Sequence, residues 1–408
     1  MRNLRSVLLA ATAAVCVHAH ADTVKIAYID PLSGPFANVG ELGLKHFQYM
    51  ADEINRRNLA GGVQLEIVPF DNKVSPQESL NALKQAIDRG IHYITQGNGS
   101  SVAGALIDAV QKNNERNPGQ TVVFLNYAAV DPDFTNSKCS YWHFRFDANS
   151  DMKMEALTTY LAKDATIKNV YLINQNYSFG QAVARAAREY LGKKRPDIKI
   201  VGDDLVPLGQ VRDFAPYVAK MKAAGTDTVI TGNWGTDMTL LVKAAKDAGL
   251  NTNFYTYYAG GLGTPTAMGD SALGRVKQIS EWHLNVPTKD TEALGTAFHD
   301  RTKLDWYYYR VGTLMYMLAE AMKESKSADP LAVAKALEGM KYQTDLGEVE
   351  MRAADHQLLN PLYVSTIERV ADSHLKHDVE GTGFGFRTDA RIEAAAAALP
   401  TSCQMKRP

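Results

Sequence analysis

Short apolar stretches alternate with longer amphipathic stretches along most of the chain. The strand-like runs of the first third are VKIAYI, VQLEIVPF, HYITQ and TVVFLNY. Helical periodicity lies between them, over residues 41–55, 76–89 and 101–114. Past Arg145 the same rhythm restarts, with strand-like runs such as NVYLINQ, IKIVGDDLVP, TDTVIT and NFYTYY. Alternation of this kind is typical of parallel sheets with helices on both faces, so the pattern predicts two doubly wound α/β halves in tandem.

The segment 276–340 departs from this rhythm because it is mostly helical. It contains LGTAFHDRTK and YRVGTLMYMLAEAMKES, and shorter strand and turn material follows it. Late helices must pack on an existing sheet, and the first half has the fewer covering elements. We therefore expect the chain to cross between the halves more than once, through extended segments that act as a hinge.

The first 21 residues have the order of a cleavable export signal. Arg2 and Arg5 precede an apolar stretch over residues 7–17, and Ala19-His20-Ala21 supplies small residues at the cleavage positions. This apolar stretch is too short to span a bilayer. We expect a mature chain that begins at Asp22 and is exported to the periplasm. Lipid anchoring at Cys16 is the less favoured alternative, because Ala14-Val15 fits the lipoprotein pattern poorly.

The net charge of the chain bears on its partner, and its length bears on the number of lobes. Loss of residues 1–21 removes two arginines and no acids, so the formal net charge changes from −1 to −3. Such a balance argues against nucleic acid as a partner. The mature chain exceeds the usual size of a single core, and two lobes of about 100 to 200 residues are expected.

Cysteine usage predicts one crosslink. Cys139 and Cys403 are the two cysteines that remain after cleavage, and in an oxidising compartment an even pair favours a disulfide, with free thiols as the alternative. Metal binding is disfavoured because Cys139 has only His143 near it, and the pair His374 and His377 lacks a third ligand. We expect no metal and no cofactor.

The loop GNGSSVAGALIDAV opens a helix with several small and polar residues. It fails as a dinucleotide-binding fingerprint, because Val102 stands where a third Gly is required, and it lacks the second Gly of a nucleophile elbow. Free backbone N–H groups, the helix dipole and the hydroxyls of Ser100 and Ser101 suit a carboxylate. Capping of the helix by Ser100 is the simpler interpretation, and both roles can coexist.

Several aromatic residues fall at strand ends and loops rather than in helical stripes. They are Tyr127, Tyr177, Phe179, Trp234, Tyr257 and Tyr258. In doubly wound sheets these ends line the ligand crevice. Packing beneath the loops accounts for part of the set, and the remainder would form an apolar wall around a small organic solute.

Five segments in order give the chain a family resemblance: VKIAYIDPLSGPFANVG, GNGSSVAGALIDAV, NYSFGQAVARAAREYL, DTVITGNWGTDMTLLVKAAKDAGL and DPLAVAKALEGMKYQTDLGEVEMRAADHQLLNPLYV. The chain resembles the branched-chain amino acid (Leu/Ile/Val-type) periplasmic binding proteins of ABC transporters, over essentially all of the mature sequence. The resemblance implies a type I binding-protein fold with three crossovers as its hinge. It implies one lobe over 24–145 plus 277–352 and a second over 146–276 plus 353–408, with the Cys139–Cys403 link near the hinge.

The resemblance also implies the ligand-binding positions. Ser100 and Ser101, with Gly99 before them, match the carboxylate-binding region. The remaining matches are the backbone of Ala128 and Ala129, the pocket wall at Val39, and the second-lobe aromatics Phe179 and Trp234.

Two positions depart from that pattern. Val130 replaces a Thr that holds the polar end of the amino acid, and Ala259, just after Tyr257 and Tyr258, stands where the acid that pairs with the α-ammonium belongs. A buried ammonium without a carboxylate partner is costly. We therefore expect a carboxylate, keto acid or small amide without an α-ammonium, unless Glu281 or Asp237 supplies the charge.

The predicted function is capture of a small carboxylate-bearing solute, an amino acid or an aromatic or aliphatic acid, by a monomeric, non-enzymatic protein. This protein would deliver the solute to an ABC permease at the membrane, a partner that the resemblance implies. The alternative is an exported serine hydrolase with Ser101 as nucleophile, for which His283 and Asp237 are isolated candidates. A third hypothesis is a ligand-sensing receptor module, which differs from the transport hypothesis only in its partner.

Overall fold

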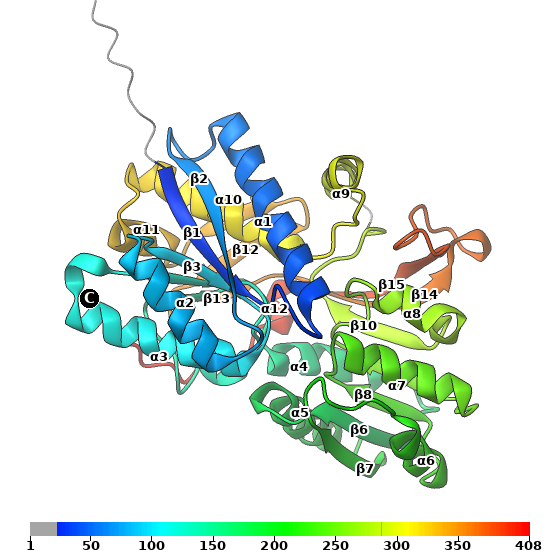
Figure 1. Cartoon of the computed structure of the whole chain (residues 1–408). Helices are drawn as coiled ribbons and strands as arrows, with labels where there is room; N and C mark the ends of the chain where they lie inside the picture. Colours follow the sequence, from blue (N-terminus) through cyan, green and yellow to red (C-terminus); the bar gives the residue numbers. More distant parts are fainter. Residues whose placement is uncertain (1–22, 287) are drawn as a thin grey trace, which may run out of the picture.

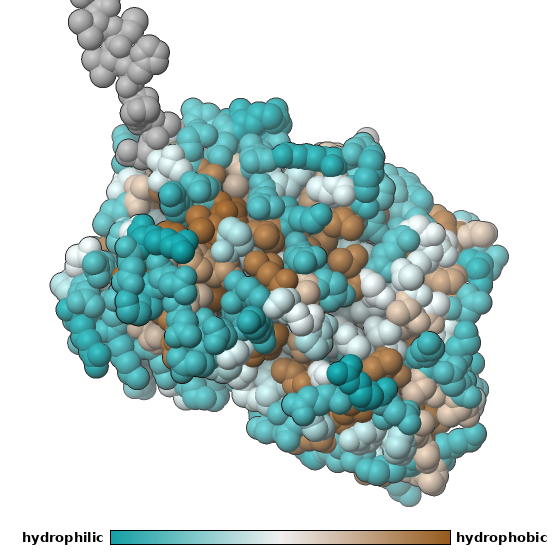
Figure 2. Space-filling view, viewed as in Figure 1, coloured by the Kyte–Doolittle hydropathy of each residue, from teal (hydrophilic) through white to brown (hydrophobic). Residues whose placement is uncertain are grey.

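The structure is a computed structural model that describes residues 23–286 and 288–408; the predicted signal lies outside these residues. Two parallel-rich sheets, each covered by helices on both faces, lie side by side (Figure 1). The α/β fold predicted from the alternating pattern is confirmed. Hydrophilic residues cover most of the face seen in Figure 2, and apolar side chains emerge there only in patches. None of the described helices has the length and apolarity needed to cross a membrane.

The first sheet has eight strands. In spatial order they are β11 (Lys341–Thr344), β12 (Gly347–Arg352), β13 (Gln357–Leu359), β5 (His143–Arg145), β4 (Val123–Asn126), β3 (Tyr93–Gln96), β1 (Thr23–Asp30) and β2 (Gln64–Asp71). Strands β1 to β5 pair in parallel, and the hairpin of β11 and β12 is antiparallel. Residues 26–29 of strand β1, which lies between β3 and β2, are fully buried, which explains their continuous apolar run.

Six helices belong to this half: α1 (Ala37–Arg57), α2 (Pro76–Asp88), α3 (Ser100–Arg116), α9 (Lys289–Thr302), α10 (Tyr309–Ser325) and α11 (Pro330–Leu337). Helix α10 packs against α1 and α11. Its residues Val311, Leu314 and Leu318 are fully buried in one apolar core with Ile26 of β1 and Phe47 of α1. The late helices therefore cover the first sheet, as the sequence predicted.

The second sheet has seven strands. In spatial order they are β15 (Phe384–Ile392), β14 (Leu362–Arg369), β10 (Val276–Ser280), β9 (Asn253–Thr256), β8 (Thr228–Thr231), β6 (Asn169–Gln175) and β7 (Lys199–Val206). Its helices are α4 (Ser150–Leu161), α5 (Ser178–Lys194), α6 (Ala215–Ala223), α7 (Thr236–Asp247), α8 (Thr264–Met268) and α12 (Ala394–Ala397). Short 3₁₀ turns complete the two halves: η1 (Pro118–Gln120), η2 (Pro132–Thr135), η3 (Gly269–Ala272) and η4 (Val370–Asp372).

The chain passes between the two sheets three times before its tail returns. The passages follow β5, β10 and β13. Strand β13 lies beyond the expected boundary at residue 352, yet it pairs with β5 and β12 in the first sheet. The tail after α12 also lies against the first half: Thr401 donates to the carbonyl of Thr135 at 2.6 Å, and Arg407 donates to Glu338 at 2.8 Å. The lobe boundaries themselves stay a prediction.

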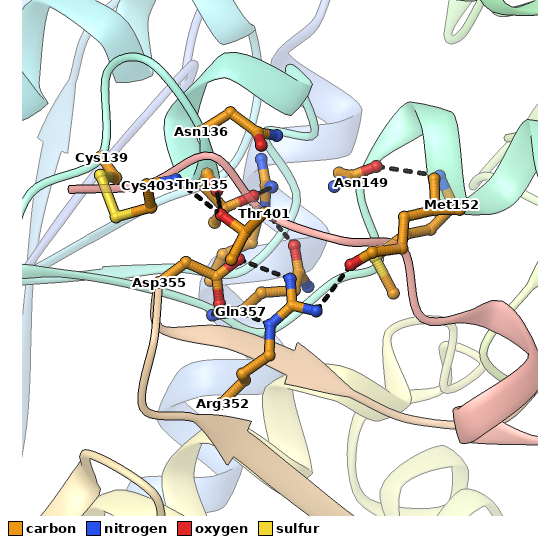
Figure 3. A network of polar contacts seen from close by, with 12 residues as sticks. Thr135, Asn136, Cys139, Asn149, Met152, Arg352, Asp355, Gln357, Thr401 and Cys403 are labelled. Atoms are coloured by element: carbon orange, nitrogen blue, oxygen red, sulfur yellow. Dashed lines mark hydrogen bonds and ion pairs between the residues drawn. A yellow bond between two sulfur atoms is a disulfide. The ribbon is translucent and has the colours of Figure 1, made fainter. Parts of the chain in front are cut away.

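A disulfide joins Cys139 and Cys403 across a sequence separation of 264 residues, with the two Cα atoms 5.7 Å apart. The predicted pairing is confirmed. Figure 3 shows that the bond shares a polar network with the passages between the sheets. In that network Arg352 donates to Asp355 and to the carbonyl of Leu399, and Gln357 donates to the carbonyl of Asp147 at 2.8 Å.

Replacing both Cys139 and Cys403 with Ser should lower the free energy of unfolding by about 3 to 5 kcal/mol, because a crosslink that closes so long a loop restricts the unfolded chain. Urea unfolding of the oxidised wild type and of the double variant measures this difference. Reduced wild type is the matched control and should unfold with the variant. Equal stability of oxidised wild type and variant would contradict the expectation.

Candidate functional site

A cleft lies between the two halves, at the carboxyl ends of their central parallel strands. The segments after β3, β4, β6, β8, β9 and β10 line it, together with Val39 of α1 and the segment 305–310 that enters α10. Carboxyl ends of parallel strands are where doubly wound proteins bind ligands. Both halves contribute walls, so a bound solute would contact both at once.

Most of the predicted ligand-binding residues come together in this cleft. Those that line it are Val39, Gly99, Ser100, Ala128, Ala129, Tyr177, Phe179, Trp234, Tyr257 and Tyr258. Tyr127 is fully buried behind the lining, where its hydroxyl donates to Asp30 at 2.8 Å. Ser101 is exposed and does not line the cleft, because successive residues of a helix point about 100° apart. The predicted roles of Tyr127 and Ser101 as ligand contacts are therefore corrected.

The start of helix α3 forms the polar wall of the first half. Gly99 precedes the helix with a φ of 98°, a conformation that favours glycine, and no side chain caps the helix. The predicted capping by Ser100 is therefore wrong, because Ser100 is already the first helical residue. Ser100 is 2% exposed, and its hydroxyl has no hydrogen-bond partner among the described residues. The free N–H groups of the first turn and this hydroxyl are both available to an anion.

Asp30 at the end of β1 holds this loop in place from behind. Its carboxylate accepts hydrogen bonds from the backbone N–H of Asn98 at 2.9 Å and of Gly97 at 3.2 Å, besides the Tyr127 hydroxyl. Burial raises the pKa of Asp30 to about 7, although these donors act in the opposite direction. The sequence analysis missed Asp30, whose signal was a lone acid at the end of an apolar strand.

Aromatic side chains build the apolar walls. In the second half the indole N–H of Trp234 donates to the Tyr177 hydroxyl at 2.8 Å, and Phe179 lies 6.0 Å from Tyr258 between ring centroids. Phe36 approaches from the first half, with its ring centroid 4.3 Å from that of Trp234. Further aromatic lining residues that the sequence analysis missed are Trp282, Trp306, Tyr307 and Tyr308. Trp282 follows β10 in a segment that the sequence predicts to be mostly helical, and residues 306–308 precede helix α10 rather than follow a strand.

A buried ionic network forms the floor of the cleft, and Arg310 of α10 is its centre. Its guanidinium donates to Glu281 at 2.6 Å and to the carbonyl of Tyr127 at 2.6 Å, and it lies 3.6 Å from the carboxylate of Asp147. Asp147 also accepts from the ammonium of Lys153 at 2.8 Å, and both of these side chains are fully buried. Two cations and two anions thus neutralise one another.

The network shifts the pKa values of its basic groups in opposite directions. Burial lowers the pKa of Lys153, and the ion pair with Asp147 only partly offsets this effect. Burial also acts to lower the pKa of Arg310, but the carboxylates of Glu281 and Asp147 outweigh it and the pKa is raised. Arg310 therefore stays positively charged. It holds the chain segment after β5 through Asp147 and the segment after β10 through Glu281.

The residues of the hydrolase hypothesis do not form a catalytic arrangement in the described part of the chain. No hydrogen bond there joins Ser101, His283 and Asp237. His283 interacts with the Thr388 hydroxyl at 2.8 Å, and burial lowers its pKa to about 3. Asp237 accepts from Gln175 and from the N–H of Gly209, both at 2.8 Å, and is not part of the lining.

Comparison with known proteins agrees with this architecture. The family model described as "periplasmic binding protein" matches residues 23–373. The Leu/Ile/Val-binding protein homolog 4 of Brucella melitensis is 33% identical over 407 residues, which cover 96% of this chain and 94% of that protein. The chain therefore belongs to the periplasmic binding protein family. It is a solute-binding protein of the kind that serves ABC transporters, and its relatives are binding proteins rather than enzymes.

Two solved structures illustrate the likeness. The closed conformation of a leucine-, isoleucine-, valine-, threonine- and alanine-binding protein from Brucella ovis matches with a TM-score of 0.84 and 30% identity, covering 95% of this chain and 100% of that one. A solute-binding protein of an ABC transporter from Rhodopseudomonas palustris, in complex with 3,4-dihydroxybenzoic acid, matches with a TM-score of 0.78, covering 91% and 98%. At 20% identity this second match shows a shared fold alone.

Replacing Arg310 with Met should lower the free energy of unfolding by about 3 to 5 kcal/mol, because Glu281 is left buried without its cation. Urea unfolding measures the loss. The matched control is Arg369→Met, which removes an ion pair whose side chains are 43% and 64% exposed and should cost less than about 1 kcal/mol. Similar losses in the two variants would show that the network adds nothing beyond a surface pair.

Proposed function

We propose that this protein is exported by its N-terminal signal, captures a small carboxylate-bearing solute without an α-ammonium, and delivers it to an ABC permease. One observation carries the choice of solute: among the described residues the cleft offers an open anion site at Ser100, whereas its lining acids Glu281 and Asp305 already have partners. Membership of the periplasmic binding protein family supports the role in solute transport.

The carboxylate would bind at the start of α3. The Ser100 hydroxyl has no partner among the described residues, and the first N–H groups of the helix provide further donors. Helix N-termini favour anions because the backbone dipoles point their positive ends there. The hydrogen bonds of Asp30 to Gly97 and Asn98 hold this loop before any solute arrives, which reduces the entropy lost on binding.

An α-ammonium would find no free acid in the described lining. Val130 lines the cleft without a hydroxyl, and Ala259 is fully buried outside the lining. Glu281 does line it, but its carboxylate is already paired with Arg310. Asp305, the other lining acid, accepts from the backbone N–H of Glu380 and from His299. An ammonium beside this floor would also meet Lys153 and Arg310, and like charges in a desolvated site repel strongly.

The body of the solute would lie among the aromatic side chains. Trp234, Phe179 and Tyr257 from the second half suit a flat ring or a branched aliphatic chain. The R. palustris proteins of this fold hold benzoate and hydroxybenzoates, whereas the Brucella and Pseudomonas relatives carry amino acids in their names. Aromatic acids and amino acids should both be tested as ligands, because they differ in the α-ammonium group that we expect the cleft to reject.

Capture would stabilise the closed arrangement of the two halves. A solute that contacts both walls favours the closed state by its extra contacts there. Periplasmic binding proteins close by such a hinge movement of their two domains around the ligand. In this molecule the rings of Phe36 and Trp234 meet across the cleft, so closure shields the solute from water.

Matched pairs of solutes test the absence of an ammonium. Leucine and 4-methyl-2-oxopentanoate share one side chain, as do phenylalanine and phenylpyruvate. We expect the oxo acids, and benzoates, to raise the melting temperature of the purified protein, while the amino acids leave it unchanged, since a solute that binds only the native state stabilises it. Mass spectrometry of the small molecule released from freshly purified protein is the independent check. Release of leucine, isoleucine or valine would overturn this choice of solute.

The anion site is tested by two neighbouring serines. Ser100→Ala should weaken binding of an acid by about 10-fold or more, because a hydrogen bond to a charged group is lost. Ser101→Ala is the matched control and should bind as wild type does, since Ser101 lies outside the lining. Isothermal titration measures both. A loss confined to Ser101→Ala, or ester hydrolysis abolished by it, would favour the hydrolase hypothesis instead.

A further inference from the structure

Lys153 lies at the edge of the cleft, and its side chain is fully buried. It lies in the first turns of α4, its side chain is 0% exposed, and it lines the cleft. Lysines are almost never fully buried unless they are paired. The pair here is Asp147, 2.8 Å away, and this is the one hydrogen bond that the ammonium donates in the described part of the chain. An ammonium has three N–H donors, so its capacity is not exhausted.

The groups that face Lys153 come from four other segments of the chain. The ring of Tyr258, after β9, lies 4.9 Å from the ammonium. Asp147 lies on the first passage, and Glu281 and Arg310 act on Lys153 electrostatically from the second passage and from α10. Both acids are already shared with Arg310. The surroundings of Lys153 therefore supply enough negative charge to hold the ammonium. In the described part of the chain its remaining donors make no hydrogen bond, and Oδ1 of Asp147 is likewise left without a partner.

Tyr258 has an unsatisfied polar group at the same place. Its hydroxyl is buried and has no hydrogen-bond partner among the described residues. Buried polar groups are nearly always paired, and an unpaired one in a native protein calls for an explanation. Burial raises the pKa of this phenol well above its ordinary value, so the hydroxyl keeps its proton. A protonated phenol and an ammonium with unused donors thus lie together in the wall of the second half.

We propose that Lys153 and Tyr258 form a second polar subsite, which binds an acceptor oxygen of the solute from the side opposite to the helix α3 wall. The solute then carries a keto or hydroxyl oxygen in addition to its carboxylate. This inference rests on the proposed function, because it concerns the same cleft and the same acids. It also gives the second half a specific polar contact with the solute, where the aromatic walls supply only apolar contact.

Pairs of acids that differ by one oxygen isolate this contact. The pairs are 4-methyl-2-oxopentanoate with 4-methylpentanoate, which tests a keto oxygen, and 4-hydroxybenzoate with benzoate, which tests a ring hydroxyl. Isothermal titration of the full mature chain should show the oxygen-bearing acid of at least one pair binding about 10-fold more tightly or better, as expected for a hydrogen bond to a charged donor.

Tyr258→Phe is the cleanest variant, because the hydroxyl that it removes holds no other part of the protein. It should reduce the ratio of the affinities for the oxygen-bearing acid and for its partner acid by about 5-fold. Tyr171→Phe is the matched control: Tyr171 lies outside the lining and its hydroxyl donates to Asp204 at 2.6 Å, so its loss should lower stability without changing the preference.

Lys153→Met combined with Asp147→Asn removes both charges of the pair together, so that neither remains buried alone. The double variant should abolish the preference, and circular dichroism checks that it folds. Wild type that binds both acids of each pair equally, or variants that weaken both acids alike, would overturn the subsite while leaving the proposed function intact. Wild type that binds none of the four acids would overturn both.

Discussion

Arg310 neutralises two carboxylates that the chain brings in on separate passages between its sheets. Glu281 follows β10, Asp147 follows β5, and Arg310 itself begins helix α10 of the first half. Charges taken out of water must be paired, and this requirement leaves the passages little freedom in where they can lie relative to α10. Lys153 extends the same pairing into the second half through Asp147. The floor of the cleft is thus a balanced ionic unit to which both halves are attached.

The chemistry of the cleft follows from that balance. In the described part of the chain the cations and anions of the floor are paired with one another, so the lining offers no unpaired acid to a positively charged solute, while the α3 wall at Ser100 is open to an anion. The walls between are aromatic, and the hydroxyl of Tyr258 is left without a partner beside Lys153. These features together favour a solute with a carboxylate, an apolar body and a further oxygen over a zwitterionic amino acid.

The tail of the chain adds a covalent constraint to the same region. After α12, which packs against α4 of the second half, the tail returns to the first half and is held there by the disulfide to Cys139. Hydrogen bonds connect this tail with Arg352 of β12 and with Thr135 of η2, and Gln357 connects β13 with the first passage (Figure 3). A segment fixed to both halves near their hinge restrains how the halves can move relative to each other.

The sequence by itself determined the class of fold, the pairing of the two cysteines, and most of the cleft residues at strand ends, because periodicity and strand-end position are local properties of the chain. It missed Asp30, Lys153, Arg310 and the aromatic residues at 282 and 306–308, whose roles arise from contacts between segments far apart in sequence. It also assigned Ser101 and Tyr127 to the ligand, which the helical rotation and the burial of these residues correct. Only the tertiary structure decided which charges neutralise one another, because ion pairing depends on distances in space that the order of residues does not specify.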